Sequence, residues 1–192
     1  MRGRGDTAVV QTDTTELMTA EELERLDIPG KSTELVRGRL LVHEPPSEYH
    51  GRIAAKLLFV LGQHVYTRKL GWLFGEAGFK IASTPDTVRA PDVAFVAKER
   101  QPLLKKRGFG SFAPDLVVEI LSPGDRPGEV LSKVGDWLAA GSKLAFVIDP
   151  VRREARVYRA DGTQTLVAEN DRLDGEDVLP GFSCALADFL DD

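Results

Sequence analysis

Apolar residues repeat along the chain with two different periods, which predict helices in some segments and strands in others. Across residues 50–69 an apolar residue recurs at every fourth position, which predicts a long amphipathic helix. A second apolar stripe, opened by Pro127, predicts a helix over residues 127–140. A capping-box pattern at Thr19 predicts a shorter helix over residues 20–26.

Continuous or alternating apolar runs predict the strands. The strongest run, LVVEIL at 116–121, is apolar on both faces apart from one glutamate, which predicts a central strand. Glycine-containing turn signals at Arg37-Gly38 and Asp161-Gly162 predict two β-hairpins. The remaining expected strands cover residues 33–36, 39–43, 72–82, 87–96, 144–148, 154–159 and 163–168.

This order of elements predicts the α/β class, as an α+β mixed sheet with helices on both faces and extra β-hairpins. The strand–helix–strand unit over 116–148 should be a right-handed crossover with parallel strands. Residues 179–192 should form a docked turn and a short helix. We expect residues 18–192 to form a single domain and residues 1–17 to be a mobile N-terminal extension.

Composition narrows the class of protein without indicating a substrate. The chain of 192 residues is 42% hydrophobic, and no apolar run reaches the roughly 20 residues that a membrane helix needs. No secretory signal is expected, and the lone Cys184 excludes a disulfide framework, so a cytoplasmic protein is predicted. A net charge of −5 argues against coating nucleic acid by bulk charge, although a nuclease needs only local basic patches. We interpret the basic stretch 98–107 as a solvated loop.

Glu119 is the first candidate for chemistry, because it interrupts an apolar strand. Burying an ionised carboxylate away from water without a partner would destabilise the fold by roughly several kcal/mol. Glu119 must therefore be paired, protonated or bound to a cation. An Arg or Lys on the neighbouring strand would satisfy it structurally, and a metal ion would satisfy it functionally.

Asp92 is the second candidate, since it follows Pro91 directly and precedes an apolar run. If Asp92 and Glu119 lie on neighbouring strands, they can share a divalent cation, and oxygen ligands favour Mg²⁺ or Mn²⁺. Asp115 stands in a second Ala-Pro-Asp sequence. Four residues of strand separate it from Glu119 by about 13 Å, so we interpret Asp115 as structural.

A Pro-Asp, a spacer and a glutamate are also typical of the PD-(D/E)XK nuclease superfamily, whose motif ends in Glu-X-Lys. Leu121 stands where that lysine is expected. Lys133, at the edge of the apolar stripe of the following helix, is the predicted substitute, because a lysine stem can extend along a sheet. The alternatives are that Lys133 is an ordinary surface lysine and that Lys80 supplies the charge.

The chain also resembles the Uma-two family of restriction-endonuclease-like proteins, over roughly residues 18–190. The resemblance rests on the following segments, in this order: MTAEEL (18–23), TELVRGRLL (33–41), His50, RAPDVAFV (89–96), APDLVVEILSP (113–123), KVGDWLAAG (133–141), FVIDP (146–150) and LPGF (179–182). The chain departs from the family at Trp137, where tyrosine is frequent, and at 144–146, where LAF replaces Glu-Tyr-Trp.

The resemblance implies a restriction-endonuclease-like core, a catalytic lysine supplied by the helix, and roles for Glu34 and His50. From the residues alone, Glu34 could complete a metal shell or simply face solvent. His50 lies on the apolar face of its helix and could be a satisfied core histidine.

These patterns together predict a Mg²⁺-dependent endonuclease that hydrolyses DNA phosphodiester bonds. Asp92, Glu119 and Glu34 are the predicted metal ligands, and Lys133 and His50 complete the predicted catalytic set. The alternatives are a non-catalytic DNA-binding or protein-interaction module on the same fold, and a hydrolase of another phosphoester. Since restriction-type enzymes that cut both strands usually work as two-fold dimers, we expect a homodimer.

Overall fold

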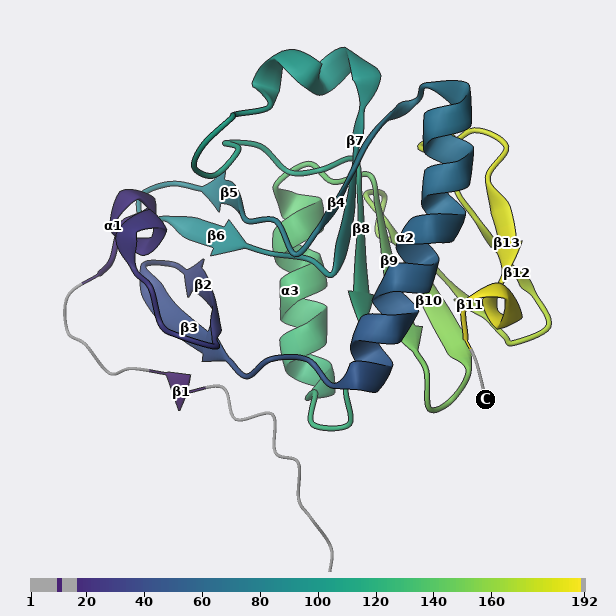
Figure 1. The fold of residues 1–192 in the computed structure, drawn as a ribbon, viewed down its shortest axis with the longest axis horizontal. Helices are drawn as coiled ribbons and strands as arrows, with labels where there is room; N and C mark the ends of the chain where they lie inside the picture. Colours follow the sequence, from purple (N-terminus) through teal and green to yellow (C-terminus); the bar gives the residue numbers. More distant parts are fainter. Residues whose placement is uncertain (1–9, 12–16, 191–192) are drawn as a thin grey trace, which may run out of the picture.

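A six-stranded sheet forms the centre of the fold in the computed structural model, which describes residues 10–11 and 17–190 (Figure 1). Its strands, in spatial order, are β11 (Gln164–Val167), β10 (Glu154–Arg159), β9 (Leu144–Asp149), β8 (Leu116–Ile120), β7 (Val93–Ala97) and β4 (Gly71–Gly75). Only β8 and β9 pair in parallel, and the other neighbours in this sheet are antiparallel. The parallel pairing of β8 with β9 and the central place of β8 confirm the predicted parallel strands of this unit and the predicted central strand.

Two smaller sheets flank this one. The first has five strands in the order β1 (Val10–Gln11), β3 (Arg39–His43), β2 (Ser32–Val36), β6 (Thr87–Arg89) and β5 (Phe79–Ala82). The second pairs β12 (Arg172–Asp174) with β13 (Ser183–Ala185). The predicted hairpin at residues 37–38 is present, with φ of 51° at Arg37 and 77° at Gly38, as a tight hairpin turn requires.

Helices cover both faces of the six-stranded sheet. The described helices are α1 (Ala20–Arg25), α2 (Glu48–Arg68) and α3 (Pro127–Ala139), with 3-10 turns η1 (Lys98–Leu103) and η2 (Leu186–Asp188). Alternate residues of β8 point to opposite faces. Val118 packs in the cluster that contains Leu57 of α2, whereas Val117 packs in the cluster that contains Trp137 of α3. This arrangement confirms the mixed α/β class, and none of the described helices is long and apolar enough to cross a bilayer.

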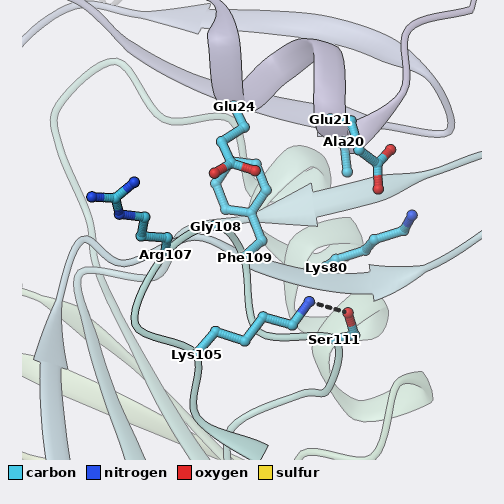
Figure 2. Close-up of a pocket in the computed structure, with 9 residues that line it drawn as sticks. All are labelled: Ala20, Glu21, Glu24, Lys80, Lys105, Arg107, Gly108, Phe109 and Ser111. Atoms are coloured by element: carbon cyan, nitrogen blue, oxygen red, sulfur yellow. Dashed lines mark hydrogen bonds between the residues drawn. The ribbon is translucent and has the colours of Figure 1, made fainter.

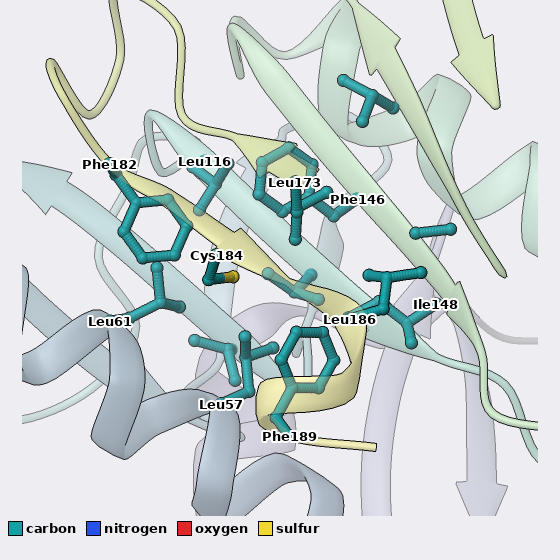
Figure 3. Close-up of a cluster of buried hydrophobic side chains, with 14 of the residues drawn as sticks. Leu57, Leu61, Leu116, Phe146, Ile148, Leu173, Phe182, Cys184, Leu186 and Phe189 are labelled. Atoms are coloured by element: carbon teal, nitrogen blue, oxygen red, sulfur yellow. The ribbon is translucent and has the colours of Figure 1, made fainter. Parts of the chain in front are cut away.

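The C-terminal segment closes the core on the α2 face of the sheet. Figure 3 shows Leu57 and Leu61 of α2 facing Phe182 and Phe189 from this segment. The prediction that the segment docks is therefore confirmed. The short helix expected there is only the 3-10 turn η2, and the β12–β13 pair was not expected, because three-residue strands are too short to show an alternating pattern.

Two of the expected strands were wrong in extent, because the chain crosses between the large sheets twice. Residues 72–82 supply β4 to one sheet and β5 to the other, and residues 87–96 supply β6 and β7 in the same way. Pro91 has no N–H to donate to a strand ladder, and Glu76 has a positive φ of 50°, so pairing is interrupted at both places. The second crossing places Asp92 at the junction of the two sheets.

The predicted mobility of the first 17 residues mostly concerns residues 1–9 and 12–16, which lie outside the described part of the chain.

Candidate active site

Asp92 and Glu119 lie opposite each other at the end of two adjacent strands. The antiparallel register ends with Val93 opposite Val118, and Asp92 and Glu119 are the next residues on the two sides. The Ile120 N–H donates a 2.6 Å hydrogen bond to Asp92 Oδ2 and fixes that side chain against β8. The two carboxylates are close enough for the charge of Asp92 to raise the pKa of Glu119.

Glu119 is a buried carboxylate that two groups from α3 hold in place. Lys133 Nζ lies 2.9 Å from Oε2, and the Trp137 indole N–H donates a 2.9 Å hydrogen bond to Oε1. The lysine and the tryptophan are four residues apart, which places them on one face of the helix. Burial raises the pKa of Glu119 to about 7, with Lys133 opposing this shift and the charges of Asp92 and Glu34 adding to it. A carboxyl group with this pKa readily exchanges its proton for another cation near neutral pH.

The Lys133 ammonium lies among oxygen atoms from three elements of the fold. Besides Glu119, its Nζ lies 3.1 Å from Glu34 Oε1 and donates a 2.9 Å hydrogen bond to the carbonyl of Ala90. Burial disfavours the charged form, but the surrounding carboxylates outweigh it and raise the pKa of Lys133 above its ordinary value. Although Leu121 occupies the Glu-X-Lys position, the structure thus brings a lysine to Glu119 from the next helix.

Glu34, on β2, has both of its oxygens engaged. Oε1 accepts the N–H of Ala90 at 2.9 Å as well as facing Lys133, and Oε2 accepts from Arg89 at 2.8 Å. His43 Nε2 lies a further 3.6 Å from Oε2. Burial opposes ionisation, yet Lys133, His43 and Arg89 together hold the pKa of Glu34 well below its usual range. Glu34 is therefore an ionised residue that anchors two cations.

Arg89 connects this hairpin to α3. Its Nε and Nη2 atoms donate to Asp136 Oδ2 at 3.1 and 2.7 Å, and its Nη1 donates to Glu34. The Arg89 side chain is only 7% exposed. Because its fork is rigid, Arg89 sets the position of β2 relative to the helix that carries Lys133.

His50 contacts the other side of Asp92 from the first turn of α2. Its Nε2 lies 3.3 Å from Asp92 Oδ2 and 3.0 Å from the carbonyl of Ile120. The hydrogen bond with Asp92 raises the pKa of His50 above its ordinary value, although burial opposes the shift. Ser47 caps this helix by accepting a hydrogen bond from the His50 N–H at 3.2 Å. The cap fixes the backbone position from which the His50 imidazole extends.

Asp115 lies apart from this cluster, at the start of β8. Its carboxylate accepts the Ala97 N–H at 2.9 Å and pairs with Lys143 at 3.0 Å and Arg100 at 3.2 Å. The structural interpretation of Asp115 is therefore confirmed, and the residue keeps part of the basic stretch 98–107 against the sheet.

A separate cavity of about 120 Å³ lies between α1, β5 and the loop before β8 (Figure 2). Its walls include Lys80, Lys105 and Glu24, and none of the proposed site residues. Lys80 pairs with Asp86 at 2.8 Å. Lys80 is therefore paired with a carboxylate outside the site, and it does not supply the positive charge beside Glu119.

The charges of the site leave room for a divalent cation. Four carboxylates and two permanent cations make up the site: Asp92, Glu119, Glu34, Asp136, Lys133 and Arg89. When all four carboxylates are ionised and His50 is neutral, four negative and two positive charges give −2, and a protonated His50 makes the sum −1. Among the described residues, no three His, Cys, Asp or Glu side chains form a ready-made metal cage. The two neighbouring carboxylates of Asp92 and Glu119 instead fit Mg²⁺, which usually keeps several waters and takes one or two protein carboxylates.

A comparison with protein-family models identifies the family of the chain. The family model Uma2, described as "Putative restriction endonuclease", matches residues 20–187. The chain belongs to this family. The matched region contains every residue of the site, and membership confirms the resemblance seen in the sequence and supports a nuclease function. No curated protein matches the chain.

A solved structure shares the fold of this Uma2 chain. It is described as a putative nuclease belonging to DUF820 from Anabaena variabilis ATCC 29413. The two chains are 20% identical, with a TM-score of 0.77, and the match covers 90% of this chain and 97% of the other. At this identity the likeness confirms the fold and nothing finer.

Four residues of the Uma2 site were missed in the sequence: Arg89, Asp136, His43 and the indole of Trp137. They join the site through contacts between different elements, which no local spacing encodes. One signal was available, since a buried Glu34 requires a cationic partner and Arg89 stands next to the Ala-Pro-Asp segment.

Proposed function

We propose that this Uma2 protein is a Mg²⁺-dependent nuclease that hydrolyses the phosphodiester bonds of DNA. The observation that carries the proposal is the meeting of Asp92, Glu119 and Lys133 at the junction of two sheets. Two neighbouring carboxylates supply ligands for a hard cation, and the adjacent ammonium supplies positive charge for a phosphate. A structural ion pair between Lys133 and Glu119 alone would not need Asp92 beside it.

Each side chain has a role that follows from its contacts. A Mg²⁺ ion bound here would polarise a phosphoryl oxygen and lower the pKa of a water molecule. Asp92 and Glu119 would hold the ion, and Lys133 would stabilise the charge that develops on the phosphate. His50 keeps Asp92 in position through its Nε2 contact. Glu34 contacts both Lys133 and Arg89, and it would position Lys133.

DNA is the proposed substrate because the family is described as one of restriction endonucleases. Cutting both strands of a duplex would require two sites of opposite orientation. A two-fold homodimer, with each protomer cutting one strand, is the simplest assembly that provides them.

The protein is expected to cleave plasmid DNA in the presence of Mg²⁺ or Mn²⁺, and not in the presence of EDTA. Asp92→Asn is expected to reduce cleavage to background, because a neutral amide is a poor ligand for Mg²⁺. Gel assays of initial cleavage rates across a metal titration would measure both effects.

Asp115→Asn is the matched control, since it makes the same change in the second Ala-Pro-Asp sequence, away from the site. It should retain metal-dependent cleavage when assayed below its melting temperature. Cleavage that survives in Asp92→Asn would contradict the proposal. DNA binding by the wild-type protein without any cleavage would favour the non-catalytic module.

Mg²⁺ is also expected to stabilise the folded protein, because it binds the native site and not the unfolded chain. At 100 times its Kd the stabilisation is about 2.7 kcal/mol, or roughly 5–10 °C in Tm for a chain of this size. Glu119→Gln should abolish the shift, measured by thermal melting at constant ionic strength. A shift that persists in this variant would mean that the cation binds elsewhere.

A further inference from the structure

The indole of Trp137 combines complete burial with a polar contact to the candidate metal ligand. The residue is 0% exposed and packs against Phe79 with ring centroids 6.4 Å apart. Its N–H group, which can only donate, points at Glu119 Oε1 with a hydrogen bond of 2.9 Å. The ring cannot rotate without breaking its packing, so the position of this donor is fixed.

Two side chains of the same helix, α3, therefore contact the Glu119 carboxylate. Lys133 Nζ contacts Oε2, and Trp137 Nε1 contacts Oε1. Two donors on the two oxygens define the plane of the carboxylate as well as its position. Packing alone would not need the N–H, because another aromatic ring could fill the same space.

We propose that Trp137 is a positioning residue for metal binding, whose indole N–H holds Glu119 Oε1 and so fixes the orientation in which the carboxylate meets a metal ion. The proposal rests on the function proposed above and concerns the same site. Partners that orient a metal ligand typically contribute about 10- to 100-fold to metal affinity. Trp137 would act on Mg²⁺ affinity through Glu119, without touching the ion or the substrate.

The expected result is that Trp137→Phe weakens Mg²⁺ binding about 10- to 100-fold, measured as Kd by isothermal titration calorimetry on the full chain. Trp72→Phe is the matched control, because Trp72 is the only other tryptophan and lies on β4, a strand that carries none of the site residues. It should leave the Kd unchanged. In the Trp72→Phe background, emission from Trp137 alone should change as Mg²⁺ binds, which gives a spectroscopic signal from the site itself.

A second variant separates the hydrogen bond from packing. Replacing Trp137 with 3-benzothienylalanine exchanges the indole N–H for sulfur and keeps the bicyclic shape. It should weaken Mg²⁺ binding as much as phenylalanine does, while its metal-free Tm stays closer to that of the wild type. An unchanged Kd in this isostere would overturn the proposal, even if Trp137→Phe is unstable.

The result also distinguishes this inference from the proposed function. If the wild-type protein binds Mg²⁺ and the isostere binds it equally well, the positioning role fails and the nuclease proposal stands. If the wild-type protein itself shows no Mg²⁺ binding and no metal-dependent cleavage, the proposed function fails, and the positioning role fails with it.

Discussion

A Lys133→Met variant is expected to lose about 100- to 1,000-fold in kcat, the usual effect of removing one group that stabilises developing charge. Methionine keeps the length of the side chain but leaves no positive charge beside Glu119 Oε2. Since Asp92 and Glu119 remain in place, the KM for DNA should change much less than kcat. The Mg²⁺-induced rise in Tm should also persist. Steady-state cleavage kinetics and thermal melting would test these expectations together.

Lys80→Met is the matched control for this experiment. Lys80 is also partly buried and paired, at 2.8 Å from Asp86, but it lies on β5 outside the site. It should keep wild-type kcat. Full activity in Lys133→Met would contradict a role of this lysine in the reaction. Loss of activity in both variants would show that the assay responds to destabilisation of the protein and not to the site.

The fold should survive the loss of Lys133 because its partners keep other contacts. Glu34 retains Arg89 and the N–H of Ala90, and Glu119 retains the Trp137 indole. Removing the ammonium takes away the main charge that opposes burial, so the pKa of Glu119 should rise further. Glu119 can then become neutral by binding a proton.

An Arg89→Met variant is expected to lose about 3–5 kcal/mol of unfolding free energy, as removal of one partner from a buried ion pair commonly does. Arg89 pairs with Glu34 and Asp136 at once, and its side chain is 7% exposed. Protonation of Glu34 would not readily relieve the loss of its partner, because Lys133 and His43 still hold the pKa of Glu34 low. Urea denaturation monitored by circular dichroism would measure the loss.

Arg159→Met supplies the control on a pair that is more open to solvent. Arg159 contacts Glu176 at 2.6 Å, with exposed fractions of 23% and 34% for the two side chains. Solvent screens such a pair, so the loss should stay below about 1 kcal/mol. Equal losses in the two arginine variants would contradict the view that the site is built on a buried ionic network.

The sequence predicted those parts of the site that disturb a local pattern. Glu119 stood out because it interrupts a strand that is apolar on both faces, and Asp92 because it follows a proline before an apolar run. The structure places them opposite each other. Lys133 was found from its place on the stripe of the following helix, and the structure brings it to Glu119. Their catalytic and metal-binding roles remain predictions.

The parts that were missed depend on contacts between distant segments. Arg89 and Asp136 each look like ordinary surface charges in the sequence, and they meet only because β6 packs beside α3. The division of residues 72–82 and 87–96 between two sheets was hidden for the same reason, since an apolar run does not reveal which sheet a strand joins. Periodicity predicts the elements, whereas partners depend on the tertiary arrangement.

The peptide that crosses between the sheets at Ala90 has a consequence for how the site tolerates sequence divergence. Ala90 contributes its N–H to Glu34 and its carbonyl to Lys133, so both contacts belong to the main chain. Pro91 restricts the backbone of the residue before it to extended conformations, whichever side chain that residue carries. Position 90 can therefore change its side chain during evolution without releasing either partner, while the identities of Glu34 and Lys133 stay constrained. The two contacts made by the main chain at position 90 can therefore be conserved when the residue at that position is not. A comparison of residue types alone would underestimate how much of the site two relatives share.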